Sequence, residues 1–331
     1  MPQIDLTSQR VHVADRGSGD AIVFLHAFPL QAAMWDYQVE AFEGTHRCVT
    51  IDLPGFGQSD EPAKPESATM AGYADQVVGV LDALGIDKAT VVGASMGGYV
   101  VMALLRNHPA RVAQVVLAGT KARSDDAAAA SRRTEQQDQV RAGAEVASAA
   151  KGIVESLLSS GSLSRTDLVE YVHALAGGAT PGGWVAALEA MKRRDDSMLV
   201  LRKAGVRSLV IVGELDRVTP IADAYSLRSM LKGELAVIPG VGHLPNLEDP
   251  WAFNDALAAF LGVTPGDLAG DEAEEAGEAT DGDEAQGPDA APAAQPDAAQ
   301  PDAAPAALAG DETPPPDAVG NEPEALAGNP G

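Results

Sequence analysis

The chain has 331 residues, of which 45% are hydrophobic, and a formal net charge of -25. Residues 264–331 hold 17 of the 48 acidic residues, 11 of the 22 prolines and no lysine or arginine, which leaves residues 1–263 with 31 acids against 23 bases and a net charge of -8. We therefore predict one domain over residues 1–263 followed by an acidic extension. This composition excludes a basic nucleic-acid surface, and no apolar run approaches the roughly 18 residues of a membrane span.

The cysteine count and the first residues set further limits. Cys48 is the only cysteine, so neither an internal disulfide nor a zinc site of several thiolates can form. Met1 to Asp5 show no charged stretch followed by an apolar one, so no secretory signal is indicated. We expect a cytoplasmic protein that has no nucleic-acid or membrane partner, and the oligomeric state stays open.

Short apolar runs and amphipathic segments alternate over most of residues 1–263. Near-continuous apolar strands separated by helices are typical of a mostly parallel sheet with helices on both faces. Such a sheet binds its ligands at the carboxyl ends of its strands. We expect strands at residues 21–26, 48–52, 90–93, 112–118, 208–213 and 235–238, and helices at residues 70–84, 96–107 and 250–261.

The pattern changes at residues 121–203, which show no strong strand signal. We interpret this segment as a helical cap inserted over the ligand end of the sheet. Some of its cationic residues could attract an anionic substrate, although most of them are better explained as solvated charges on helix faces. The expected cap helices are residues 121–150, 151–158, 166–176 and 184–191, and the cationic residues are Lys192, Arg193, Arg194, Arg202 and Lys203.

The extension at residues 264–331 is rich in alanine, proline, glycine, aspartate and glutamate. This composition buries too little apolar surface to offset the entropy of the chain. We predict that the extension is disordered and acts as a solubilising appendage, so its deletion should leave any catalysis intact.

The sequence Gly93-Ala94-Ser95-Met96-Gly97 lies between a predicted strand and a predicted helix. A serine on such a sharp turn needs strained backbone angles, and the residues two before and two after it must be small because they come close together. The turn would lift the Ser95 hydroxyl above the sheet and would aim the Met96 N–H at a developing oxyanion. We therefore predict that Ser95 is a nucleophile rather than an incidental serine in a glycine-rich turn.

A nucleophilic serine needs a base, and the base needs an acid that orients it. Asp216 follows the strand predicted at residues 208–213, and His243 follows the last predicted strand, so both lie at the expected edge of the sheet. Alone, each would be explained as a loop residue. Glu214 competes with Asp216 but lies closer to the strand, and we favour Asp216.

The second oxyanion donor should come from the loop after the first apolar strand, where His26-Ala27-Phe28-Pro29 lies. The backbone N–H of Phe28 is the candidate, since Pro29 has none. Trp35 and Trp184 could form walls of the substrate pocket, although tryptophans in such positions are more often simple packing residues.

Together these residues resemble the α/β-hydrolase family over residues 10–262. The similarity includes Asp52-Leu53-Pro54-Gly55-Phe56-Gly57-Gln58-Ser59 and His243-Leu244-Pro245-Asn246-Leu247-Glu248 in addition to the three motifs above. The resemblance implies Ser95 as nucleophile, His243 as base, Asp216 as its partner, and the Phe28 and Met96 amides as oxyanion donors. Ala27 departs from the glycine usual after the histidine, and a serine at position 95 excludes the relatives that use an aspartate nucleophile.

Within the family the chain is similar to small bacterial esterases, including 3-oxoadipate enol-lactone hydrolases. We therefore expect a serine hydrolase that cleaves a small carboxylic ester or lactone through an acyl-enzyme, without a metal or organic cofactor. Two alternatives stay open: a hydrolase of carbon–carbon bonds in a vinylogous diketone, and a hydrolase-like binding protein without catalysis.

Overall fold

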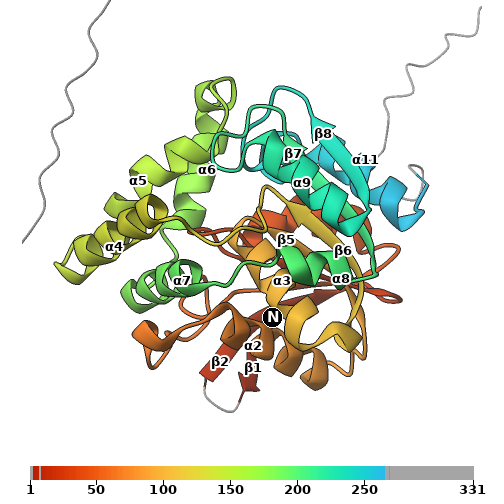
Figure 1. Cartoon of the computed structure of the whole chain (residues 1–331), viewed down its shortest axis with the longest axis horizontal. Coiled ribbons are helices and arrows are strands. Elements are labelled where there is room, and N and C mark those ends of the chain that lie inside the picture. Colours follow the sequence, from red (N-terminus) through yellow and green to blue (C-terminus); the bar gives the residue numbers. More distant parts are fainter. Residues whose placement is uncertain (1–2, 7–8, 265–267, 269–331) are drawn as a thin grey trace, which may run out of the picture. The chain divides into compact units, whose positions relative to one another are not determined.

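A computed structural model describes residues 3–6, 9–264 and 268 of the chain (Figure 1). Within these residues the strands form one eight-stranded sheet in the order β1-β2-β4-β3-β5-β6-β7-β8. The strands are β1 (Gln3–Leu6), β2 (Gln9–Arg16), β3 (Ala21–Leu25), β4 (Arg47–Ile51), β5 (Ala89–Ala94), β6 (Val112–Ala118), β7 (Arg207–Gly213) and β8 (Glu234–Ile238).

The sheet is mostly parallel, as the sequence predicts. Only the pairs β1–β2 and β2–β4 are antiparallel, and the other five neighbouring pairs are parallel. The sequence analysis missed β1, which lies at the edge of the sheet, and β2, which lies next to it, because both carry polar residues and few buried apolar ones. In β2 only Val11, His12 and Val13 are buried, which is too short a run to stand out.

Helices cover the sheet in two groups. Helices α2, α3, α8 and α9 contact one another in series, and α1 and α11 contact each other separately, as expected for a parallel sheet with two covered faces. The helices are α1 (Asp36–Phe42), α2 (Met70–Ala83), α3 (Met96–Asn107), α4 (Ala127–Arg141), α5 (Val146–Leu157), α6 (Thr166–Ala176), α7 (Pro181–Arg193), α8 (Met198–Lys203), α9 (Ile221–Leu231), α10 (Pro245–Glu248) and α11 (Pro250–Leu261), with short 3₁₀ turns η1 (Ala32–Trp35), η2 (Pro65–Ser67), η3 (Pro109–Arg111) and η4 (Ser162–Ser164).

Local sequence signals account for many of the helix ends. The Thr69 hydroxyl accepts a hydrogen bond from Gly72 N–H at the start of α2, over 3.0 Å. Helix α11 begins with a proline at its first position and ends at Gly262, whose φ of 77° only glycine adopts without strain.

Helices α4 to α7 lie between β6 and β7 in the chain, and Figure 1 shows them gathered to one side of the sheet. Helix α4 packs against α7, and α5 packs against α6. Residues 121–150, which the sequence analysis expects to be helical, are divided between two helices: α4 ends at Arg141, α5 begins at Val146, and Gly143 between them has a φ of 95°. Helix α8, which the predicted cap includes, packs against α3 and α9.

The limits of the cap at 121–203 and of the domain at 1–263 stay predictions. The prediction of a disordered extension over residues 264–331 falls outside the described residues, apart from Thr264 and Leu268.

The register of the parallel strands brings several loops together. Leu25 pairs with Gly93, Ala94 with Ala118, and Gly213 with Ile238, so β3, β5, β6, β7 and β8 end at one edge of the sheet. The loops that follow these strands therefore meet above that edge, and they carry the residues predicted to form the site.

Candidate active site

Ser95 occupies a strained turn between β5 and α3. Its φ of 50° and ψ of -108° make it one of two non-glycine residues with positive φ in the described part of the chain. Such backbone angles cost on the order of 1–3 kcal/mol and persist where the surroundings enforce them. The turn therefore has the strained geometry that the sequence predicts for a nucleophilic serine.

Two glycines make this turn possible. A Cβ on Gly93 would lie 2.6 Å from the carbonyl carbon of Gly97, and a Cβ on Gly97 would lie 2.2 Å from the carbonyl oxygen of Leu25. Both positions therefore exclude any side chain, because neighbouring backbone atoms already fill the space.

His243 lies between Ser95 and Asp216 and contacts both. Its Nε2 is 2.9 Å from Ser95 Oγ, and its Nδ1 is 2.8 Å from Asp216 Oδ2. Because a carboxylate only accepts, Nδ1–H donates to Asp216, and Nε2 is left to accept the Ser95 hydroxyl proton. The side chains of His243 and Asp216 have no exposed surface, and Ser95 is half-buried.

Asp216 is held by donors on its own loop. Its Oδ1 accepts hydrogen bonds from the N–H of Val218 (2.8 Å) and Thr219 (2.9 Å), and its Oδ2 accepts one from the Thr219 hydroxyl (2.7 Å). Burial raises the pKa of Asp216, but the His243 ring and the Thr219 donors outweigh burial, so that the net pKa lies below its ordinary value. Asp216 is therefore ionised at neutral pH.

Glu214 does not contact His243. Its side chain is exposed, and its carboxylate accepts a hydrogen bond from Gly240 N–H over 3.0 Å. Of the two acids that the sequence offers, the structure brings only Asp216 to the imidazole.

The loop after β3 is fixed by a histidine whose role the sequence analysis did not derive. His26 is fully buried, its Nε2 accepts a hydrogen bond from Leu53 N–H over 3.0 Å, and its Nδ1 donates to the carbonyl oxygen of Ala27. Burial lowers the pKa of His26, which keeps the ring neutral and able to accept. This ring therefore helps to fix the loop that carries Phe28.

The two predicted oxyanion donors lie close to the site. Phe28 lines the same cavity as Ser95 and His243. Met96 is the first residue of α3, so its N–H belongs to the first turn, which has no partner inside the helix. Their role as donors stays a prediction.

The two predicted pocket tryptophans lie behind the site rather than on its surface. Trp184 is fully buried, its ring centroid lies 4.7 Å from that of Phe28, and its Nε1–H donates to the carbonyl oxygen of Gln136. Trp35 is also fully buried and packs against Phe24 and Phe253. Neither is among the residues that line the cavity at Ser95, so Trp184 supports Phe28 from behind and Trp35 belongs to the core.

Comparison with known proteins places this geometry in a family. A model of the α/β hydrolase fold matches residues 20–250. The chain belongs to the α/β hydrolase fold family.

Several proteins of known name are similar to this α/β hydrolase over about three quarters of its length. The 3-oxoadipate enol-lactonase 2 of Acinetobacter baylyi is 29% identical over 266 residues, which cover 77% of this chain and 95% of the relative. The 2-hydroxymuconate semialdehyde hydrolase of Pseudomonas sp. (strain CF600) is 26% identical over 264 residues, covering 76% and 90%. A solved thermophilic esterase from Thermogutta terrifontis, with malate bound, matches with a TM-score of 0.76 and 29% identity, covering 79% of this chain and 98% of that chain.

In this α/β hydrolase the cavity beside Ser95 has a volume of about 260 Å³. Residues of α4 and α5 and of the loops after the strands are among those that line it. Its charged lining residues, apart from the His243 ring, are Lys121, Asp125, Arg132 and Arg133, none of which the sequence analysis selected. Their charge could be read from the sequence, but nothing local indicated that they face Ser95.

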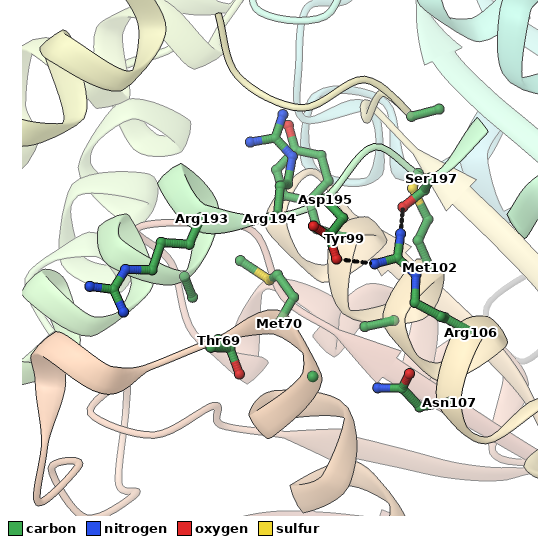
Figure 2. A pocket seen from close by; sticks show the side chains of 14 residues that line it. Thr69, Met70, Tyr99, Met102, Arg106, Asn107, Arg193, Arg194, Asp195 and Ser197 are labelled. Atoms are coloured by element: carbon green, nitrogen blue, oxygen red, sulfur yellow. Dashed lines mark hydrogen bonds and ion pairs between the residues drawn. The ribbon is translucent and has the colours of Figure 1, made fainter. Parts of the chain in front are cut away.

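The cap cations named in the sequence analysis lie elsewhere. Arg193 and Arg194 line a second cavity of about 250 Å³, where Figure 2 shows Arg106 reaching Asp195 and Ser197. Lys192 and Arg193 both form ion pairs with Glu189. Tyr99, one turn after Ser95 on α3, lines both cavities.

Arg194 is the link between the two cavities of this α/β hydrolase. Its guanidinium lies 4.0 Å from the centre of the Tyr99 ring and 2.7 Å from Asp125 Oδ1. It also donates to the carbonyl oxygens of Met191 and Arg123. The guanidinium thus joins the end of α7 to the loop after β6 and to the helix that begins at Ser95.

Residues 3–6, 9–264 and 268 contain neither a candidate metal site nor a candidate membrane span. In that part of the chain no group of three or more His, Cys, Asp and Glu side chains could hold a metal ion, and no helix is both long and apolar enough to span a bilayer. Independence from metals and cofactors stays a prediction.

Proposed function

We propose that the chain hydrolyses small carboxylic esters or lactones, with Ser95 as nucleophile, His243 as general base and Asp216 as the residue that orients the imidazole. The observation that carries this proposal is the position of His243, whose two ring nitrogens lie 2.9 Å from Ser95 Oγ and 2.8 Å from Asp216 Oδ2. The ester and lactone chemistry of relatives at 29% identity supports the substrate class.

The proposed reaction begins with attack of Ser95 Oγ on the carbonyl carbon while its proton passes to His243 Nε2. The positive imidazole is stabilised by Asp216, which is ionised at neutral pH. The negative oxygen of the tetrahedral intermediate is stabilised by the N–H groups of Phe28 and Met96. The C–O bond then breaks as Nε2 returns the proton to the leaving alcohol, which in a lactone remains attached to the acyl group.

The acyl-enzyme is resolved by water. His243 Nε2 takes a proton from the water as its oxygen attacks the acyl carbon, and the same proton is then given to Ser95 Oγ as the acid is released. The chain's own residues supply every proton transfer in this scheme.

The test is turnover of p-nitrophenyl acetate and of a panel of small lactones by the full chain and by Ser95→Ala. We expect the variant to lose all turnover above the uncatalysed rate with an unchanged melting temperature, because the nucleophile is lost and its surroundings are kept. Turnover at the wild-type rate in Ser95→Ala would refute the proposal. A fluorophosphonate probe adds a direct check, because only an activated serine reacts with it, and an unlabelled wild-type chain would favour a binding protein without catalysis.

A second candidate is hydrolysis of a carbon–carbon bond in a vinylogous diketone. It is favoured by the 26% identity to the 2-hydroxymuconate semialdehyde hydrolase over 90% of that protein. A ring-fission diketone assayed beside the lactones separates the two, since the proposed function requires kcat/KM to be higher for an ester or lactone.

A further inference from the structure

The cavity at Ser95 has a positive lining in an acidic protein. Lys121, Arg132 and Arg133 line it, and Asp125 is the carboxylate among its charged lining residues. Residues 1–263 carry a net charge of -8, so this concentration of cations runs against the charge of the domain around it. A cleft lined by one sign of charge raises the local concentration of ligands of the opposite sign.

Asp125 does not neutralise the positive charge of this lining, because its single negative charge is paired with two arginines, Arg133 and Arg194. Its Oδ2 is 2.5 Å from Arg133 Nε, its Oδ1 is 2.7 Å from an Arg194 nitrogen, and its side chain has no exposed surface. One carboxylate thus meets two guanidinium groups, and this buried cluster keeps a net positive charge. Burial raises the pKa of Asp125, but the two arginines outweigh it and the net pKa is lowered.

Lys121 and Arg132 are the two cations of the lining that do not pair with Asp125. Among the described residues neither forms an ion pair or a side-chain hydrogen bond, in contrast to Arg133 on the same helix as Arg132. They also come from two different elements. Lys121 lies on the loop after β6, two residues past Gly119, where an added Cβ would lie 3.2 Å from His243 Nδ1, whereas Arg132 lies on α4.

We propose that Lys121 and Arg132 bind a carboxylate of the substrate that does not react, so that the natural substrate is a small ester or lactone carrying a free acid group. This proposal rests on the proposed function, because the acid group is bound while Ser95 attacks the ester carbonyl. A cavity of about 260 Å³ lies below the usual range for drug-sized ligands, which favours a short dicarboxylic skeleton. A guanidinium and an ammonium that both reach one carboxylate can satisfy its two oxygens.

The experiment compares matched pairs of substrates. Half methyl esters of the four- to six-carbon dicarboxylic acids are assayed beside the same esters with the free acid converted to an amide, which has the same shape without the charge. The readout is kcat/KM from proton release at constant pH, at low and high salt. We expect the charged ester of at least one pair to be favoured by about tenfold or more at low salt, and the preference to shrink as salt screens the charges.

Variants assign the preference to the two residues. In Lys121→Gln together with Arg132→Gln the ratio of charged to neutral kcat/KM should fall to about one, and each single variant should give an intermediate ratio. Lys203→Gln, which removes an exposed cation on α8, is the matched control and should keep the wild-type ratio. A wild-type ratio near one, or a ratio that survives the double substitution, overturns the proposal.

A binding measurement separates this proposal from the proposed function. Isothermal titration calorimetry of Ser95→Ala with each half methyl ester and its amide counterpart measures affinity without turnover. Binding of the charged ester at least tenfold more tightly than its amide supports the anion site even if the wild-type chain hydrolyses neither, whereas equal affinities overturn it even if both are hydrolysed.

Discussion

The backbone N–H of His243 donates to the carbonyl oxygen of Leu157 over 2.8 Å, so the last residue of α5 holds the loop that carries the imidazole. Glu248 strengthens the same junction. Its buried carboxylate accepts hydrogen bonds from the N–H groups of Ser159 (2.8 Å) and Gly242 (2.9 Å), on the two sides of the joint. The helical insertion and the proposed base are therefore tied together by backbone contacts and by one buried acid.

Glu248→Gln should weaken this junction. The carboxylate also accepts a hydrogen bond from Leu244 N–H over 3.3 Å. The amide nitrogen of glutamine cannot accept, so at least one of these three N–H groups loses its partner, at a cost of about 1.5–3 kcal/mol for a bond to a charged group. We expect a lower midpoint in urea unfolding and a fall in kcat of about tenfold, because the His243 loop loses its support. Glu170→Gln, an exposed acid on α6, is the control and should change neither quantity. Unchanged unfolding and kcat in Glu248→Gln would show that the loop needs no such support.

Asp216→Asn should remove most of the activity while keeping the fold. The asparagine amide can donate to His243 Nδ1 and so favour the tautomer in which Nε2 carries the proton and cannot accept from Ser95. We expect kcat to fall by about 10⁴, the size seen when a triad aspartate is replaced in this way. Glu214→Gln is the matched control, since Glu214 lies two residues away and does not contact the imidazole. Equal losses in the two variants would contradict the assignment of Asp216.

Gly97→Ala should damage the turn at Ser95. The new Cβ would lie 2.2 Å from the carbonyl oxygen of Leu25, which is backbone and cannot rotate away. We expect a loss of about 1–3 kcal/mol in the free energy of unfolding, together with a fall in kcat. Gly152→Ala on α5 is the control, because its Cβ meets nothing within 4 Å, and alanine there should stabilise the helix by up to about 1 kcal/mol. Urea unfolding that ranks the two variants the other way would refute this account.

Asp125→Asn should leave two guanidinium groups, on Arg133 and Arg194, without their shared anion. Removing one member of a buried ion cluster costs about 3 kcal/mol or more. The pKa of Asp125 is lowered in the folded chain, so its stabilisation is complete above the unfolded value of about 3.9 and is lost as the pH falls through the folded value.

The difference in unfolding free energy between wild type and Asp125→Asn should accordingly be full at pH 7 and shrink only below about pH 4. Urea unfolding over pH 3–7 measures it. Asp138→Asn, which removes an exposed i,i+3 partner of Arg141, should change stability by less than about 0.5 kcal/mol at any of these pH values. A gap for Asp125→Asn that widens toward pH 3 would contradict this account.

Much of the fold around the site was predictable because it depends on local signals. Helix α3 and strand β6 have the bounds that the sequence predicts. The signals that set the bounds of α3 are local: the Gly93–Gly97 spacing and the apolar run before it mark the start of the helix, and Pro109 follows its end. The order of Ser95, Asp216 and His243 after parallel strands also follows from the sequence, because parallel strands end at one edge of the sheet. That reasoning places the three loops near one another but gives no distances.

Other features depend on contacts between distant segments, which no local pattern records. Trp35 and Trp184 are large aromatic residues of the kind that often line pockets, yet residues distant in sequence pack around both and bury them. The sequence offered five cap cations, Lys192, Arg193, Arg194, Arg202 and Lys203, and explained most of them as solvated charges. None of the five lines the cavity at Ser95, whereas Lys121 and Arg132 do. Strand β1 and its neighbour β2 went unnoticed because β1 has no buried residue and β2 has only three.

The sequence by itself thus determined the class of sheet, the strained turn at Ser95 and the positions of Ser95, Asp216 and His243 after parallel strands, because each depends on short-range geometry and on one rule of parallel sheets. Only the tertiary structure decided that Asp216 rather than Glu214 meets His243, that Asp125 is enclosed by two arginines, and which cations face Ser95. Those outcomes depend on how segments that are distant in sequence pack against one another and orient their side chains. The burial and ion-pair energies that decide this packing are properties of the whole fold.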